Sequence, residues 1–365
     1  MRQNERVRER EPEPLRVQVD PWYEEMLTRD RAQAERRQTG EIFIRGAEQP
    51  WHQNRNARVR YLLHTLKPGT AVADMNVFVH EIWKHSGLHR HQGGLAIYAL
   101  EGRGHTVVNG VAEEWEAGDL LLLPLAPGGV DHQHFNDGGQ PARWLALIYK
   151  PWHEVIGNQM VQVTESPQWA AFARASGQAE SGTVEAARSS VEMPVGLPPA
   201  DDGTLLDAIF QRRDAYRAQV AGSPNVVRGR ELPWETNRQG RMKWYLHPDK
   251  RDAPIRTLLV WEQEIPPNGR SGRQLHPGGL VHYFLKGEGY TIVDGRRYDW
   301  VAGDCLALPR RVYGTDYQHF NPHGSQPARF VAMTANVLDV LGADGGSRLE
   351  QLAVAPEYER VHGRR

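Results

Sequence analysis

Two short stretches of the sequence carry histidines at spacings that suit metal binding. His89 and His91 stand one residue apart, and side chains alternate along a strand, so both imidazoles would share one face. About forty residues later, the segment "DHQHFN" supplies His132 and His134. Three imidazoles on one face can hold a divalent metal and leave positions open for a substrate. Neutral imidazole suits iron, zinc, copper, nickel and manganese, so the residues alone do not select the metal.

The chain contains a second copy of this region, which serves as an internal control. "HQGGLAIYALEGRGHTVVNGVAEEWEAGDLLLLP" is echoed about 185 residues later by "HPGGLVHYFLKGEGYTIVDGRRYDWVAGDCLALP". Two copies at so long a period indicate a tandem pair of domains. In the second copy Gln274 and Tyr317 replace His89 and His132, so one imidazole of three survives. We therefore expect a metal in the first copy and none in the second.

The elements that must position the histidines are predicted to be short strands. Within "LAIYALEGRGHTVVNG" two runs of apolar and β-branched residues flank a glycine turn, and Asn-Gly then marks a hairpin. Strands at roughly ten-residue spacing indicate an all-β sandwich or barrel in each copy. Three other segments are predicted to be helices, at residues 20–38, 166–176 and 203–222, the first with Asp20 as its N-cap.

The bulk composition excludes several classes of partner. Lys and Arg total 44 against 45 for Asp and Glu, so no basic excess points to nucleic acid or to an anionic membrane surface. No apolar run approaches the roughly 18 residues needed to span a bilayer. The single cysteine, Cys305, excludes an intrachain disulfide and fits a cytoplasmic location.

The ordered motifs "HRH", "LEGRGHTVVNG", "EAGDLLLLP" and "HQHFN" resemble those of the cupin superfamily. Two copies make a bicupin, and the first copy is similar to gentisate 1,2-dioxygenases and salicylate dioxygenases, which cleave aromatic rings. The resemblance implies two tandem jelly-roll β-barrels with a few flanking and linking helices. It also implies one Fe(II) per chain in the N-terminal barrel, held by His89, His91 and His132. The implied activity is an extradiol-type cleavage that inserts both atoms of O2 into a hydroxylated aromatic compound.

The same resemblance assigns roles to residues around the predicted metal. His134 matches a histidine that contacts the substrate, where it would hydrogen-bond a phenolic oxygen or move a proton. Its counterpart in the second copy, His319, makes a structural role an equal alternative. Arg58 and Tyr98 are candidate substrate-binding residues, with an ion pair and a core position as the alternatives. Ile97 stands where this group commonly has a carboxylate-binding arginine, which puts an aromatic acid as substrate in doubt.

The expected organisation has five parts and leaves a second function open. The alternative is a metal-binding bicupin that acts as a non-oxidative isomerase or decarboxylase, or as a small-molecule-binding protein. For the dioxygenase we expect a small aromatic substrate and O2, and we expect a homo-oligomer, either dimer or tetramer. The expected parts are a charged tail and helix (1–49), a metal-binding barrel (50–150), a helical linker (151–230), a metal-free barrel (231–340) and a C-terminal tail (341–365).

Overall fold

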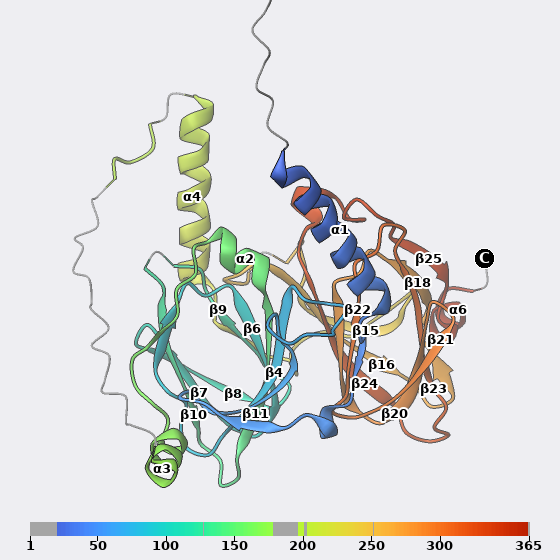
Figure 1. Cartoon of the computed structure of the whole chain (residues 1–365), viewed down its shortest axis with the longest axis horizontal. Helices are drawn as coiled ribbons and strands as arrows, with labels where there is room; N and C mark the ends of the chain where they lie inside the picture. The colour runs from blue at the N-terminus through green and yellow to red at the C-terminus, as the bar shows by residue number, and fades with distance from the viewer. Residues whose placement is uncertain (1–19, 127, 178–195, 201–202, 251, 364–365) are drawn as a thin grey trace, which may run out of the picture.

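The computed structural model of the chain contains two similar β-barrels placed side by side, with helices on the outside (Figure 1). Most strands of the first barrel are blue to green, and most strands of the second are yellow-orange to red. This architecture confirms the predicted all-β fold with a few flanking and linking helices. The predicted charged tail before residue 20 and part of the predicted linker lie outside the described residues. Those are 20–126, 128–177, 196–200, 203–250 and 252–363.

The first barrel is built from two antiparallel sheets. The larger sheet has the strand order β13-β9-β6-β11-β4-β3-β2, and the smaller has the order β12-β5-β10-β7-β8. The strands of the larger sheet are β2 (Trp51–Gln53), β3 (Arg58–Leu63), β4 (Met75–Ile82), β6 (Leu95–Glu101), β9 (Leu120–Leu123), β11 (Ala142–Tyr149) and β13 (Val226–Val227). Those of the smaller sheet are β5 (His89–His91), β7 (Arg103–Val108), β8 (Val111–Glu116), β10 (Val130–Asn136) and β12 (Val161–Gln162).

The second barrel repeats this order strand for strand, as the internal repeat predicts. Its larger sheet runs β1-β22-β19-β24-β16-β15-β14 and its smaller sheet β21-β20-β23-β18-β25, with β17 paired to β23. The strands of the larger sheet are β1 (Phe43–Ile44), β14 (Glu235–Asn237), β15 (Gly240–Leu246), β16 (Leu258–Ile265), β19 (Leu280–Lys286), β22 (Cys305–Leu308) and β24 (Ala328–Ala335). The others are β17 (Gly269–Arg270), β18 (Arg273–His276), β20 (Glu288–Val293), β21 (Arg296–Val301), β23 (Thr315–Asn321) and β25 (Glu350–Ala353).

Three longer helices fall where the sequence predicts them. In α1 (Pro21–Thr39) the Asp20 carboxylate accepts the Trp22 N–H at 2.9 Å, which caps the first turn. The helices α3 (Pro167–Ser176) and α4 (Leu205–Gly222) follow the first barrel. No helix in the described part of the chain is both long and apolar enough to cross a bilayer. The shorter helices are η1 (Gly46–Glu48), α2 (Lys150–Val155), α5 (Leu338–Leu341) and α6 (Pro356–His362).

Strand alternation divides the apolar residues between barrel interiors and the interface of the two barrels. On β6, Ile97 packs with Leu121 in the interior of the first barrel. The next residue, Tyr98, belongs to a separate core with Leu120 and residues of the second barrel such as Val260. The larger sheets are therefore apolar on both faces, because one face lines a barrel and the other joins the two barrels.

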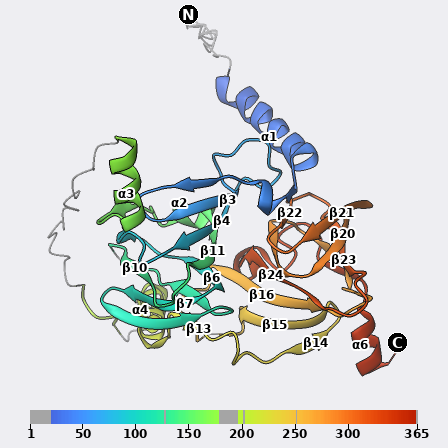
Figure 2. The same ribbon diagram turned by 90° about the horizontal axis from the view of Figure 1, so that it is seen from below.

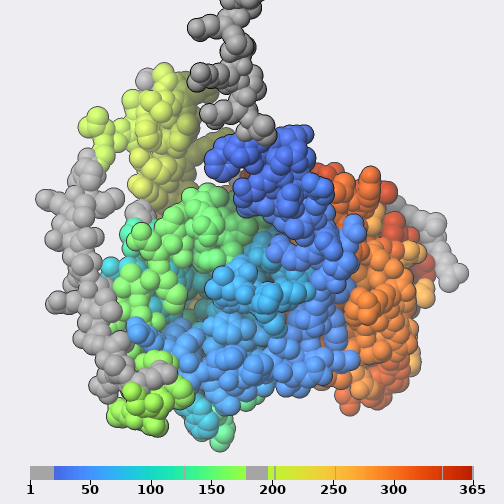
Figure 3. All heavy atoms as spheres, in the orientation of Figure 1, coloured from blue at the N-terminus to red at the C-terminus, as the bar shows by residue number. Residues whose placement is uncertain are grey.

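The barrels exchange short segments of chain. β1 precedes the first barrel in sequence but pairs with β22 of the second, and β13 precedes the second barrel but pairs with β9 of the first. Figure 2 shows β13 at the first barrel, and Figure 3 shows the blue N-terminal segment against the orange second barrel. Each barrel thus receives an edge strand from the segment that leads into the other. Barrels cut at the predicted limits of 50–150 and 231–340 would lack these strands.

Each exchanged segment ends in an Arg-Gly pair that closes over a buried aspartate. The Gly46 N–H donates to Oδ1 of Asp304 at 2.9 Å, and Arg45 lies 3.3 Å from Oδ2. Asp304 is 1% exposed, so these bonds replace the water that its carboxylate would otherwise need. The matching set in the first barrel is Arg228, Gly229 and Asp119, with the corresponding distances of 3.0 and 2.9 Å.

Candidate metal centre

Three histidines meet inside the first barrel. β5 and β10 are antiparallel neighbours, and their register places His132 directly opposite His89. The ring centroids lie 4.0 Å apart for His89 and His132, 4.6 Å for His91 and His132, and 5.6 Å for His89 and His91. All three side chains are buried, and one nitrogen of each lies within 4.8 Å of the others. The structure thus brings together the three predicted metal ligands.

Alternation along β5 explains why the two histidines face inward. His89 and His91 are buried, whereas the side chain of Arg90 between them is 27% exposed. Arg90 forms two hydrogen bonds of 2.8 Å to the carboxylate of Asp131. Because Asp131 is the neighbour of His132, this ion pair on the outer face supports the register that aligns the imidazoles on the inner face.

Backbone hydrogen bonds set the tautomer of two of the three rings. Nδ1 of His89 and Nδ1 of His132 lie 3.3 and 3.2 Å from the carbonyl oxygen two residues earlier. A carbonyl oxygen can only accept, so Nδ1–H donates and Nε2 keeps a lone pair for a metal. His91 differs, because its Nδ1 accepts the Gly93 N–H at 3.0 Å. His91 must release that contact to bind a metal through Nε2 as a neutral imidazole.

Burial keeps these imidazoles neutral at ordinary pH. It lowers the pKa of His89 to about 4 and the pKa of His91 to about 3, and it holds the pKa of His132 well below its usual value. For His91 and His132 the neighbouring imidazoles act in the same direction, since a second positive charge in the cluster would be repelled. A divalent transition metal fits this set of buried, neutral nitrogen donors.

A cavity of about 270 Å³ opens beside the three histidines. None of its described lining residues is an aspartate or a glutamate, and Lys150 is the only lysine or arginine among them. The charge of Lys150 contributes to the lowered pKa of His91 and of His153. Two lining residues, Asn56 and His153, each carry a buried polar atom without a hydrogen-bond partner. The apolar lining includes Phe78, Leu95, Ile97, Leu123, Trp144, Ala146 and Ile148.

Comparison with known proteins identifies the fold. The sequence profile of the cupin domain matches residues 78–148 and residues 261–334, one match in each barrel. The chain therefore has the bicupin fold. Similar solved structures include mutants of oxalate decarboxylase from Bacillus subtilis. One is 14% identical over 86% of this chain and 80% of its own, with a TM-score of 0.55, and another is 13% identical over the same shares, with a TM-score of 0.54.

At this level of identity the likeness shows the two-barrel fold alone. A comparison with curated proteins gave no match. The activity of this bicupin therefore has to be argued from its own residues.

In this bicupin His134 lines the cavity on the same face of β10 as His132. The Thr106 hydroxyl lies 2.8 Å from Nδ1 of His134, and the Trp115 indole N–H donates to that hydroxyl at 3.1 Å. An indole can only donate, so the hydroxyl proton is free to point at Nδ1, and this assignment leaves the His134 proton on Nε2. Burial holds the pKa of His134 well below its usual value. His134 is thus a neutral hydrogen-bond donor toward the cavity.

Besides His134, the sequence predicts Arg58, Tyr98 and Ile97 as substrate-binding residues, and of these three the described lining includes Ile97 alone. Tyr98 follows it on β6 and faces the opposite way, into the interface between the barrels, where its hydroxyl donates to Glu262 at 3.4 Å. Arg58 pairs with Glu81 at 3.0 Å, outside the lining. These contacts are those of the two alternatives, a core position for Tyr98 and an ion pair for Arg58.

The polar residues of the lining that sequence reasoning missed include His80, Lys150 and His153. His80 is recognisable in hindsight, because it alternates with Phe78 on the inward face of β4, and burial lowers its pKa to about 3. Lys150 follows β11 directly and begins α2. The helix α2 is too short to leave a periodic pattern, so neither Lys150 nor His153 carries a signal in the sequence.

The second barrel has the same strands around the equivalent position but lacks two of the three histidines. Gln274 and Tyr317 occupy the register positions of His89 and His132, and the Tyr317 hydroxyl donates to Oε1 of Gln274 at 2.9 Å. Among the residues that the structure describes, only one group of three or more His, Cys, Asp or Glu side chains brings its ligand atoms together. That group is His89, His91 and His132.

Proposed function

We propose that this bicupin is a metal-dependent enzyme for small hydroxylated aromatic compounds, and that its chemistry is Fe(II)-dependent ring cleavage with O2. The donor set carries the proposal, because His89, His91 and His132 are buried neutral imidazoles beside a cavity with no carboxylate in its described lining. Neutral ligands leave the full charge of a divalent metal uncompensated, which favours an anionic substrate oxygen bound to it. A phenolate or a carboxylate meets that need.

The size and polarity of the cavity support a single aromatic ring as substrate. Its volume of about 270 Å³ lies just below the roughly 300–1,000 Å³ typical of sites for drug-sized ligands. Phe78, Ile97 and Trp144 provide apolar walls, which favour a ring over a small polar acid. Lys150 supplies a positive charge for a second anionic group, in place of the arginine that is missing at Ile97.

The residues of the cavity have distinct parts in such a reaction. His134 donates its Nε2–H to a substrate oxygen and stabilises negative charge there, while its low pKa keeps it from adding a positive charge beside the metal. The apolar walls keep water from the ring. A bound Fe(II) would act as a Lewis acid toward the substrate oxygens and would pass electrons from the substrate to O2, so that the metal is not consumed.

Non-oxidative decarboxylation at the same metal is the second candidate. The similar solved structures favour it, since their names are those of oxalate decarboxylase. Loss of CO2 leaves a carbanion that must gain a proton, and His134 presents a proton on Nε2 to the cavity. This reaction consumes no O2, so one experiment separates the two candidates.

The test loads the metal-free chain anaerobically with Fe(II), Mn(II) or Zn(II) and supplies catechols, hydroquinones and hydroxybenzoates. Oxygen uptake and CO2 release are followed together. Ring cleavage predicts O2 consumed one-for-one with substrate in the Fe(II)-loaded chain. Release of CO2 without O2 uptake would reject ring cleavage and establish decarboxylation. Absence of turnover with every metal and substrate would reject both candidates.

Two variants locate the activity. His132→Ala removes a ligand and should abolish turnover, whereas Arg58→Gln changes a residue outside the cavity and should leave turnover per folded molecule unchanged. A fall in turnover for Arg58→Gln as large as that for His132→Ala would place the reaction elsewhere.

A further inference from the structure

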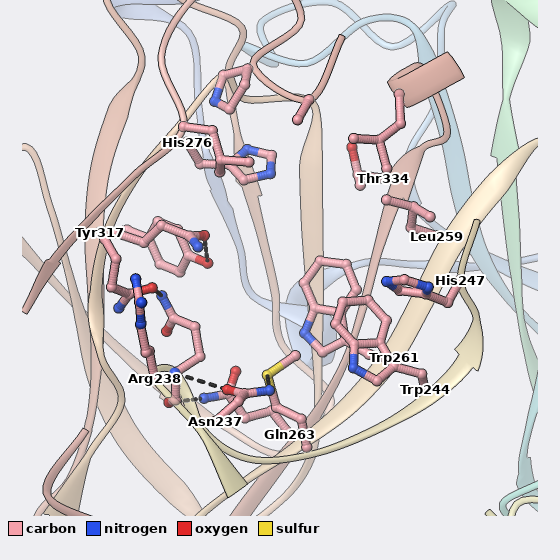
Figure 4. A pocket seen from close by; sticks show the side chains of 18 of the residues that line it. Asn237, Arg238, Trp244, His247, Leu259, Trp261, Gln263, His276, Tyr317 and Thr334 are labelled. Atoms are coloured by element: carbon pink, nitrogen blue, oxygen red, sulfur yellow. Dashed lines mark hydrogen bonds between the residues drawn. The ribbon is translucent and has the colours of Figure 1, made fainter. Parts of the chain in front are cut away.

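A larger cavity lies in the second barrel, where the proposed reaction has no use for it. Its volume is about 670 Å³, against about 270 Å³ for the cavity beside the three histidines. Figure 4 shows two unlike sides, with Trp244, Trp261 and Leu259 on one and Tyr317 and Arg238 on the other. A cavity with one apolar side and one polar side suits a ligand of the same character.

The apolar side is built around two tryptophans. The ring centroids of Trp244 and Trp261 lie 5.2 Å apart, with 47° between the ring planes. The equivalent residues of the first barrel are Tyr61 and Phe78, so each position carries a larger ring in the second barrel. Two indoles together offer a broad surface on which a flat aromatic ring can pack.

The cavity carries positive charge that its own described lining does not neutralise. Its described lining includes Arg238 and Arg310 and no aspartate or glutamate. Arg238 is exposed and makes no ion pair with any described residue, whereas its equivalent in the first barrel, Arg55, lies 3.6 Å from Glu165. Arg310 pairs through Nε with Asp74, but its Nη2 is buried without a hydrogen-bond partner. The charges favour an anion in this cavity.

A third polar group of the lining needs a partner. Gln239 is 9% exposed, and its Oε1 is buried without a hydrogen-bond partner. The neighbouring Gln263 amide is already used, since it donates to the backbone oxygen of Gln239 at 2.7 Å. Buried amide oxygens are seldom left unpaired, so a donor on a bound molecule would complete this one.

We propose that the second barrel is a metal-independent binding site for an aromatic carboxylate. The ring packs on Trp244 and Trp261, the carboxylate pairs with Arg238, and a hydroxyl or amine on the ring donates to Gln239. This site uses none of the three histidines of the first barrel, so it can be tested independently of the proposed function. A guanidinium also pairs with phosphate, and the test therefore distinguishes the two anions.

Calorimetric titration of the chelator-treated chain provides the test, with 2-naphthoate, 2-naphthamide, 2-naphthyl phosphate and acetate as probes. We expect 2-naphthoate to bind, 2-naphthamide to bind at least about tenfold more weakly without the charge pair, and acetate to bind too weakly to detect. The same affinity for 2-naphthoate should be found in His132→Ala. Tighter binding of the phosphate than of the carboxylate would overturn the choice of anion, and no binding of any aromatic probe would overturn the site.

Matched variants place the ligand in this barrel. Arg238→Gln should weaken the binding of 2-naphthoate at least about tenfold and leave the binding of 2-naphthamide unchanged. Arg55→Gln should change the affinity for neither probe. Leu259→Trp fills part of the cavity without removing any of the proposed contacts and should abolish binding of both. Affinity in Leu259→Trp equal to that of the unmodified chain would show that the ligand binds elsewhere.

Discussion

The strand order of the first barrel returns unchanged in the second, yet the two interiors hold different chemistry. In the first barrel His89 faces His132 across β5 and β10, and in the second Gln274 faces Tyr317 and bonds to it at 2.9 Å. Each outer face carries an ion pair to the equivalent aspartate, Arg90 with Asp131 and Arg273 with Asp316. Arg90 lies directly opposite Asp131, whereas Leu275 lies opposite Asp316 and Arg273 reaches that carboxylate from two positions earlier on β18.

The difference shows that the residues that fix the strand arrangement of a barrel are not the residues that decide its chemistry. Outward ion pairs hold the strands in register, and a Trp–Thr–His chain of hydrogen bonds crosses each interior. Neither depends on which residues occupy the inward positions beside them. Those positions are therefore free to carry metal ligands in one barrel and a neutral amide–phenol pair in the other.

Loss of the metal from the first barrel is the largest expected effect. His132→Ala should reduce bound metal from one equivalent per chain to none, because two imidazoles cannot hold it against a chelator. His276→Ala changes a histidine of the second barrel and should leave the metal in place. Elemental analysis after dialysis measures both. Two equivalents in the unmodified chain, or loss of metal in both variants, would contradict the contrast between the barrels.

Placing the two missing histidines in the second barrel should create a second metal site. The double variant Gln274→His, Tyr317→His restores the two missing imidazoles opposite each other in register, beside the existing His276. We expect it to bind a second equivalent of metal, because the frame around these positions matches that of the first barrel. Titration with Co(II) and its visible absorption spectrum would count the sites. A single equivalent in the folded double variant would show that more than the ligands distinguishes the two frames.

Acid should loosen the metal-free first barrel more than the second. Burial strongly lowers the pKa of six histidines in or beside the first barrel and of three in the second. Below pH 6.5 the unfolded chain therefore takes up protons that the folded chain does not bind. Stability is then lost as the pH falls from 6.5 toward about 4, by about 1.4 kcal/mol per histidine and pH unit. The histidines are His80, His89, His91, His132, His134 and His153 against His276, His282 and His319.

Hydrogen exchange of the metal-free chain between pH 7 and pH 5, corrected for intrinsic rates, measures this difference. Amides of β4 and β10 should lose protection faster than those of β16 and β23. With the metal bound the first barrel should regain its protection. Equal loss in the two barrels would contradict the prediction.

Substitutions in the exchanged segments should have a smaller effect on stability. Each should destabilise the barrel that the segment pairs with, not the barrel that the segment precedes or follows in sequence. A Cβ on Gly46 would lie 1.9 Å from the Gly303 carbonyl oxygen, and a Cβ on Gly229 would lie 1.9 Å from that of Gly118. Each alanine should therefore cost about 1–3 kcal/mol of unfolding free energy. Gly46→Ala should loosen the second barrel and Gly229→Ala the first, as read by hydrogen exchange. Gly139→Ala, at an exposed position, is the control. Faster exchange in the first barrel for Gly46→Ala, or in the second for Gly229→Ala, would refute the exchange of edge strands.

The smallest expected effect concerns the charge in the first cavity. Lys150→Gln should raise the KM for substrates with a second anionic group several-fold and leave the metal content unchanged, because Lys150 lines the cavity without belonging to the three histidines. Steady-state kinetics with matched substrates, one with and one without a carboxylate, would measure it. An equal change for both substrates would remove Lys150 from carboxylate binding.

The sequence predicts those features that depend on local patterns repeated twice. Glycine turns, β-branched runs and the "AGD" motif repeat in order, and they place both barrels and the alternation that turns His89 and His91 inward. The same alternation shows that Ile97 and Tyr98, as neighbours on β6, cannot both face one cavity. Of the two, the structure places Ile97 at the cavity and Tyr98 at the interface between the barrels.

Other features depend on contacts between distant parts of the chain. β1 and β13 have two residues each, too few for a periodic signal, and their partners lie far away in sequence. Arg58 is a plausible carboxylate ligand until Glu81 is found beside it. The cavity of the second barrel arises from side chains of several strands and of α6, and no short motif marks it.

The crossed edge strands impose an order on the making of this protein. Synthesis reaches the end of β12 at Gln162, but β13, which covers the edge of β9, begins only at Val226, about sixty residues later. At roughly 5–20 residues per second the ribosome leaves that edge bare for several seconds. An uncovered edge is a template for pairing with other chains. β1 is the first described strand to emerge, and its partner β22 is complete only when the nascent chain has passed Leu308, so β1 stays unpaired for most of synthesis.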